Sequence, residues 1–140
     1  MIGISTDSVV TLALAMSALN AALDPTGKTT AIAADNEAAI KALVDGALAR
    51  IVLELHPRLN EVRRDGDIVV VETAAEIPAG LEPTVRAALE NAVLSCILAS
   101  VTPDSEESEK NERTAAACID GLRRLLSPGA MPGLRQQTWL

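Results

Sequence analysis

The sequence predicts a mainly α-helical protein: a small bundle of about four helices with one β-hairpin and an extended C-terminal tail. Apolar residues make up 49% of the 140 residues, but there is no Phe or Tyr and a single Trp. A core of small aliphatic side chains suits closely packed helices. Apolar residues also recur at three-four spacing over several turns, and only one short stretch carries a hairpin signal.

The chain length predicts one domain with a single modest core. We expect the helical domain to occupy residues 1–127, with the hairpin at about 59–73, and an extended arm to occupy residues 128–140. The net charge of −7 argues against a protein that grips nucleic-acid phosphates, because such binding needs clustered Lys and Arg. It does not exclude a surface that DNA slides past.

A first helix is expected from about Asp7 to Leu23, capped by Thr6 or Asp7 and stopped by the breakers in residues 24–27. Residues 28–34 then form a linker. No Lys or Arg precedes this apolar stretch, and it is shorter than the roughly 20 residues of a membrane span. We therefore expect no membrane contact and a helix packed on most sides.

A second helix is expected from near Asp35, a good N-cap, to His56-Pro57, where proline ends it. Its apolar positions keep a three-four spacing over four turns, which predicts one buried face. These positions are Ile40, Leu43, Val44, Ala47, Leu48, Ile51, Val52 and Leu55.

The hairpin is expected around Asp65-Gly66, a dipeptide typical of a type I′ turn, which needs positive φ at both central positions. One arm runs from Leu59 to Arg64. The other is β-branched throughout and comprises Ile68, Val69, Val70 and Val71. A lone two-stranded ribbon is marginal in water, so this arm should bind a helix or a neighbouring subunit.

A third helix should begin at Pro83, a favourable first helical position, and lie at the centre of the core. Its expected buried face comprises Val85, Leu89, Ala92, Val93, Cys96 and Ile97, widened by Leu94 and Leu98.

The fourth helix opens with acids that suit the positive end of the helix dipole: Asp104, Glu106, Glu107 and Glu109. Apolar residues return only at Ala115, Cys118, Leu122, Leu125 and Leu126. We expect the front of this helix to project into solvent while its rear packs. The acids form either a plain solvated face or an acidic surface that faces DNA or a basic partner.

No catalytic or metal site is expected, and no cofactor. His56, Cys96 and Cys118 fall on different elements without metal-ligand spacing, and both cysteines are expected as free thiols, Cys96 buried and unreactive. Gly27-Lys28-Thr29 lacks the earlier glycine and preceding strand of a phosphate-binding loop. The sequence therefore does not predict an enzyme.

The C-terminal arm holds the only aromatic ring, Trp139. Gly and Pro at 129–133 prevent continuation of the helix. The ring could be incidental to a frayed end, fold back on its own core or dock on another chain. Its distance from the last helix favours docking on another chain, and Trp is a common interface anchor. The expected partner-binding residues are Met131, Leu134, Arg135, Gln137, Trp139 and Leu140.

From Asp35 onward the layout resembles the small head-tail connector, or adaptor, proteins of tailed bacteriophages and phage-derived particles, the Mu-like and HK97-like families. A striped helix (DNEAAIKALVDGALARIVLEL) is followed by a proline-containing link (EIPAGLEP) and an Ala/Leu helix (TVRAALENAVLSCILAS). A charged final helix (DSEESEKNERTAAACIDGLRRLLSPGA) and an extended tail complete the pattern. Such connectors often carry Tyr or Phe in the second and third helices, where this chain has Ala, Leu and Cys, and the link at the hairpin is longer than theirs.

The resemblance implies a structural virion protein rather than an enzyme. Such proteins form a twelve-fold ring, a dodecamer, between the portal of the head and the tail or stopper proteins, and they extend the channel for DNA without binding it specifically. Their C-terminal tails reach onto the portal or a neighbouring subunit. The implied location is the head-tail interface of a virion assembled in the cytoplasm of the bacterial host.

A different class of function stays open. The chain could be a stand-alone acidic helical interaction module, such as a small chaperone or regulatory subunit, whose acidic helix binds a basic partner. A monomer in solution with a buried Trp139 would fit this alternative, whereas an exposed tail that orders only on assembly would fit a connector.

Overall fold

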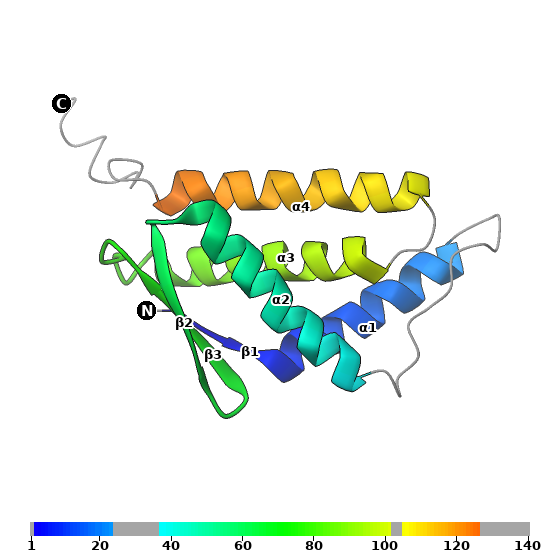
Figure 1. Cartoon of the computed structure of the whole chain (residues 1–140), viewed down its shortest axis with the longest axis horizontal. Helices are drawn as coiled ribbons and strands as arrows, with labels where there is room; N and C mark the ends of the chain where they lie inside the picture. Colours follow the sequence, from blue (N-terminus) through cyan, green and yellow to red (C-terminus); the bar gives the residue numbers. More distant parts are fainter. Residues whose placement is uncertain (1, 24–36, 102–104, 127–140) are drawn as a thin grey trace.

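The computed structural model describes residues 2–23, 37–101 and 105–126 (Figure 1). Four helices and a small antiparallel sheet make up this part of the chain, so the predicted mainly α class is confirmed. The expected arm residues Met131 to Leu140, together with Asp35 and Asp104, lie outside the described residues.

The sheet has three strands rather than the two of the predicted hairpin: β1 (Ile2–Ser5), β2 (Leu59–Asp65) and β3 (Ile68–Thr73). Their order is β1-β3-β2, and both pairings are antiparallel. Ile2 lies opposite Val71, and Ser5 lies opposite Ile68. Strand β1 of the same chain therefore stabilises the β2–β3 hairpin, which as a lone two-stranded ribbon would be marginal in water.

The hairpin turn lies one residue later than predicted. Asp65 pairs with Ile68, so Gly66 and Asp67 are the two central residues. Among the described residues, Gly66 alone has a positive φ, of 62°. A positive φ at the first central position only is the pattern of a type II′ turn, which places glycine first, so the predicted type I′ turn at Asp65-Gly66 was wrong.

The helices are α1 (Thr6–Leu23), α2 (Glu37–Leu55), α3 (Glu82–Val101) and α4 (Ser105–Leu126). Helix α3 contacts α1, α2, α4 and β1, which confirms its predicted central place. Helices α3 and α4 run antiparallel side by side, and α2 crosses them (Figure 1). The C-terminal half of α2 packs on β2 (Figure 1).

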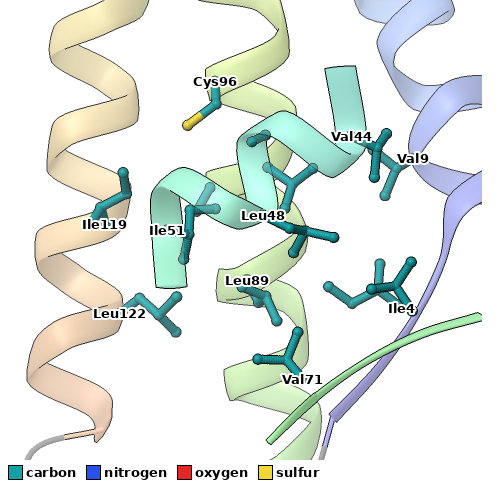
Figure 2. Close-up of a cluster of buried hydrophobic side chains, with 14 of the residues drawn as sticks. Ile4, Val9, Val44, Leu48, Ile51, Val71, Leu89, Cys96, Ile119 and Leu122 are labelled. Atoms are coloured by element: carbon teal, nitrogen blue, oxygen red, sulfur yellow. The ribbon is translucent and has the colours of Figure 1, made fainter. Parts of the chain in front are cut away.

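The core lies among the four helices and the inner face of the sheet, with α4 packed on the far side of α2 and α3 (Figure 2). The buried residues of α3 are the six predicted from its spacing: Val85, Leu89, Ala92, Val93, Cys96 and Ile97. Helix α2 contributes Ile40, Val44, Ala47, Leu48, Ile51 and Leu55, all on the predicted face. The sheet adds alternate residues of β1 and β3, Ile2, Ile4, Val69 and Val71.

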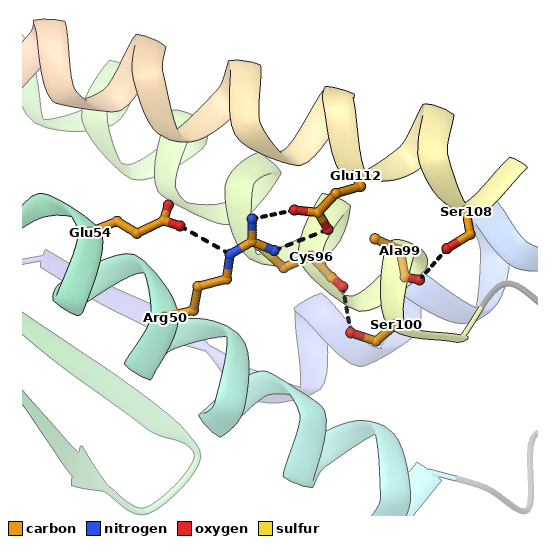
Figure 3. A network of polar contacts seen from close by, with 7 residues as sticks. All are labelled: Arg50, Glu54, Cys96, Ala99, Ser100, Ser108 and Glu112. Atoms are coloured by element: carbon orange, nitrogen blue, oxygen red, sulfur yellow. Dashed lines mark hydrogen bonds and ion pairs between the residues drawn. The ribbon is translucent and has the colours of Figure 1, made fainter. Parts of the chain in front are cut away.

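The front of α4 carries mostly exposed side chains, as predicted, and Ala115 is the first buried residue of the helix among those described; however, the helix does not project away from the bundle. It lies along α3, where the Ser108 hydroxyl donates to the carbonyl of Ala99 over 3.4 Å (Figure 3). Two turns from the helix start, Glu112 pairs with Arg50 of α2. Hydrogen bonds and an ion pair can hold the front of a helix that has no row of apolar residues. A prediction based on the spacing of apolar residues does not detect such polar contacts.

Helix α1 is packed on one side only, so the expectation that it packs on most sides was wrong. Val9, Val10 and Ala13 are buried, but Leu12, Met16, Leu19 and Leu23 are exposed. Its contacts are with α2, α3 and β1.

Candidate interaction surfaces

The β-branched arm of the hairpin is only half available to a partner. Val69 and Val71 lie in the chain's own core, between the helices and the neighbouring strands. Because side chains alternate across a sheet, Ile68 and Val70 face the other way, and Ile68 is exposed. The expectation that all four residues bind a partner is therefore corrected to Ile68 and Val70.

Four large apolar side chains form an exposed row along α1, which we call the α1 stripe. The exposed fractions are 45% for Leu12, 36% for Met16, 50% for Leu19 and 71% for Leu23. Their spacing of four, three and four residues places them on one line along the helix. Such a row is the typical contact line of one helix with another apolar element.

The α1 stripe lies on a helix without charge after its first turn. No Asp, Glu, Lys or Arg occurs between Asp7 and Asp24. By length and composition alone, α1 and α3 could each cross a membrane, a property that core helices of globular proteins share. Helix α3 is apolar because one of its faces is buried in the core. Within the described chain, no such burial explains the apolar residues of the α1 stripe.

A second apolar surface is a shallow groove between the C-terminal half of α2 and strand β2, which we call the α2–β2 groove. It encloses about 460 Å³ and is lined by Ala49, Val52, Leu53, His56, Asn60 and Val62. Leu53 forms its wall and is 79% exposed. No Asp, Glu, Lys or Arg lines it, and the adjacent Arg50 and Glu54 are paired with each other at 3.5 Å.

The two apolar surfaces are separated along α2: the helix that carries the stripe contacts the N-terminal half of α2, and the groove lies at its C-terminal half. Helix α1 meets the N-terminal half of α2, where Val9 lies beside Val44, and then runs away from it (Figures 1 and 2). The groove belongs to the other half, where α2 lies on β2. The stripe and the groove are therefore separate surfaces of one chain.

The predicted acidic surface is in part a structural element. Glu106 and Glu109 are exposed and Glu107 is half-buried, each on the first turns of α4. Glu106 and Glu107 both have interactions within the chain. Glu112, which the sequence did not single out, accepts hydrogen bonds from both terminal nitrogens of Arg50, and this hydrogen bonding raises the pKa of Arg50 against the opposing effect of burial (Figure 3).

A polar junction fixes the N-terminus of α1 to the hairpin turn. One Asp67 carboxylate oxygen accepts from the Ser5 hydroxyl at 2.7 Å, and the other accepts from the backbone N–H of Asp7 at 3.0 Å. The hydrogen bond from Ser5 is the main cause that holds the pKa of Asp67 below its ordinary value of 3.8. Asp67 thus caps α1 from a distant part of the chain. The local cap is Ser5, whose hydroxyl accepts from the backbone N–H of Ser8 at 3.3 Å, so the predicted cap at Thr6 or Asp7 was wrong.

The residues considered for chemistry form no metal-binding group, although the two cysteines lie on the adjacent helices α3 and α4. Both cysteines are free; Cys96 is buried, and burial raises the pKa of its thiol. Cys118 is half-buried, with its sulfur 3.6 Å from the hydroxyl of Ser95. Within the described residues, no group of three or more His, Cys, Asp or Glu side chains is placed to hold a metal ion.

Sequence reasoning missed β1, the α1 stripe and the α2–β2 groove. The signal for β1 was present, because Ile2 and Ile4 alternate with Gly3 and Ser5 at the period of a half-buried strand. The stripe and the groove have no comparable signal in the sequence, because the spacing of leucines along a helix does not distinguish exposed leucines from buried ones. Comparison of the chain with protein-family models, with curated proteins and with solved structures found no match.

Proposed function

We propose that the protein is a non-enzymatic assembly subunit of a phage or phage-like particle, which forms a ring between the portal and the tail and extends the DNA channel. The observation that carries this proposal is the α1 stripe, a straight row of four large apolar side chains left exposed by the chain. Contiguous exposed apolar surface of this kind marks a place where another macromolecule binds.

The charge of the chain supports a channel component more than a nucleic-acid binder. With 19 acidic and 12 basic residues, the chain repels phosphates overall. Arg50, Arg64, Arg86, Arg123 and Arg124 are paired with carboxylates of the same chain. DNA that passes such a surface has few cations to hold it.

The C-terminal arm is the proposed contact to the portal or to a neighbouring subunit. Helix α4 ends at Leu126 beside the end of α2, where Arg123 donates to the carbonyl of Glu54 at 3.4 Å. The remaining 14 residues span up to about 46 Å when extended, which is enough to reach another chain. Trp139 and Leu140 would supply the apolar anchors of that contact.

The test is to measure particle mass by light scattering over a concentration series and to image the same samples by negative-stain electron microscopy. We expect closed rings with a central opening at high concentration and smaller species on dilution. Duplex DNA mixed with the rings should not shift in a gel at moderate salt. The emission of Trp139, the only Trp, should be red-shifted in the dilute chain and blue-shifted when purified portal rings are added.

A chain that stays monomeric at all concentrations with a blue-shifted, protected Trp139 would contradict the proposal. It would favour the stand-alone interaction module with a folded-back tail. Retention of DNA by the rings would contradict the channel function and leave ring formation intact.

A further inference from the structure

We infer that the α1 stripe of one copy of the chain docks in the α2–β2 groove of the next copy. This inference rests on the proposed ring function, and it names the two surfaces that would form the contact between subunits. The stripe and the groove are different surfaces, so the contact is heterologous and can repeat around a ring.

The shapes of the two surfaces favour this pairing over a pairing of two stripes. The stripe is a convex ridge of side chains on a helix, and the groove is a concave strip between a helix and a strand. A ridge packs more completely into a groove than against a second ridge. Residues 49–56 give the α2 wall a length of about 10 Å, which accommodates two successive side chains of a helical row.

Leu19 and Leu23 are the two side chains that we assign to the groove. They are the most exposed members of the stripe, and they lie at the end of α1 that runs away from α2. They are about 6 Å apart along the helix axis, which fits the length of the groove wall. Leu53 of the next copy, itself largely exposed, would pack between them.

The charges are compatible with a contact between identical chains. Two copies with a net charge of −7 repel each other, so their contact faces must carry no unpaired acids. The stripe has no charged residue within it, and the groove lining has none either. The same lack of Lys and Arg on α1 disfavours an anionic membrane surface as the occupant, because interfacial helices hold such membranes through basic residues.

The size of the contact sets the conditions for its test. An 18-residue helix is about 27 Å long and about 10 Å wide, so even its full length would cover only on the order of 270 Å², and the two side chains assigned to the groove cover less. This is well below the roughly 800 Å² per partner of a stable complex, so a single contact should be weak and closure of a ring should strengthen it. Binary binding must therefore be measured at chain concentrations on the order of 10⁻⁴ M.

The experiment uses two full-length variants and their mixture. The stripe variant is Leu19→Glu with Leu23→Glu, and the groove variant is Leu53→Glu. All three positions are exposed, so both variants should fold, which circular dichroism and urea unfolding verify. The matched controls are Ala18→Glu, an exposed position of α1 off the stripe, and Ala42→Glu, an exposed position on the same face of α2 about three turns before Leu53.

Sedimentation velocity should show that the self-association constant of each variant alone is at least ten-fold lower than that of the parent chain. Both controls should associate like the parent chain. The mixture should form a one-to-one dimer and nothing larger, because the stripe variant keeps its groove and the groove variant keeps its stripe. No pairing between two α1 stripes can give this result.

Three outcomes would overturn the inference. Self-association of the groove variant at the level of the parent chain would show that the groove is not the partner of the stripe. A mixture that stays monomeric would show that the two surfaces do not meet. A shift in Trp139 emission in the groove variant alone, with no change in the stripe variant, would show that the chain's own arm fills the groove.

The proposed function can fail separately. If the mixture dimerises but the parent chain forms open filaments in the electron microscope, the contact stands and the ring does not. If both variants still form closed rings, the ring stands and this contact does not.

Discussion

Helices α1 and α3 have almost the same length and the same apolar character, yet the fold uses them in opposite ways. They have 18 and 20 residues, and both have a mean hydropathy of 1.4 over their most apolar windows. Helix α3 buries six side chains and has neighbours in α1, α2, α4 and β1. Helix α1 buries Val9, Val10 and Ala13 but leaves its stripe outside.

The difference teaches that apolar content alone does not specify where a helix finds its partner. Helix α3 lies between α2 and α4, so neighbours in the same chain cover its apolar face. Helix α1 lies at the edge, and within the described residues no element covers its outer side. The apolar residues of α3 thus contribute to folding of the chain, and we propose that those of the α1 stripe contribute to association between chains.

The sharpest test of this contrast compares one leucine from each helix. Leu89→Ala in α3 should lower the free energy of unfolding by about 2–5 kcal/mol, because it opens a cavity in a packed core. Leu89 is 1% exposed. Leu19→Ala in α1 should change it by no more than about 0.5 kcal/mol in the dilute chain, since that side chain already meets water. Urea unfolding at low protein concentration measures both.

The comparison would collapse if both substitutions cost the same. An equal loss would mean that a part of the chain outside the described residues covers the stripe. The same pair at high concentration gives a control, because Leu19→Ala should then reduce the apparent stability through lost association.

A smaller effect is expected at the link between α2 and α4, which holds the polar front of α4 in place. Replacing Arg50 and Glu112 by Gln, singly and together, should give a coupling free energy of about 0.5–1 kcal/mol. The pair is partly exposed, with 33% of the Arg50 side chain and 50% of the Glu112 side chain accessible, so solvent weakens it. Urea unfolding of the four chains in low salt measures the coupling.

High salt provides the control for that cycle. In about 1 M salt the coupling should largely vanish, because the screening length falls to about 3 Å. A coupling that is indistinguishable from zero at low salt would show that packing against α3, rather than this ion pair, orders the front of α4.

The sequence predicted well the parts of the fold that depend on periodic burial. The spacing in α3 identified all six of its buried residues, and the spacing in α2 identified its core face. The break at His56-Pro57 and the start of α1 near Thr6 followed from local chemistry. Each of these features depends on residues that are close together in the chain.

The features that escaped prediction depend on residues far apart in the chain. Strand β1 pairs with β3 across more than sixty residues, and Asp67 caps a helix that begins at Thr6. Burial of Ile119 in α4, and of Val69 and Val71 in the sheet, depends on which element packs opposite. The sequence pattern of the α1 stripe is the same as that of a buried helix face. The stripe is exposed because no element of the described chain covers it.

The smallest expected effect concerns how the N-terminus of α1 is held. The folded pKa of Asp67 lies below its ordinary value of 3.8, mainly because its carboxylate accepts the hydrogen bond of Ser5, with the Asp7 amide adding to the effect. Above pH 3.8, therefore, the ionised Asp67 stabilises the folded chain relative to the unfolded chain. This contribution should be lost as the pH falls from about 3.8 through the lower folded pKa. In Asp67→Asn, which has no such carboxylate, this part of the acid sensitivity should disappear.

The measurement is urea unfolding of the parent chain and of Asp67→Asn between neutral pH and strongly acidic pH. The two curves should differ most at neutral pH and converge below pH 3.8. Asp65→Asn, which removes a carboxylate on the other side of the same turn, serves as the matched control and should track the parent chain across this range. Parallel curves for the parent and Asp67→Asn would show that the Asp67 charge has no part in capping α1, and that β1 and the buried residues of α1 hold this helix without it.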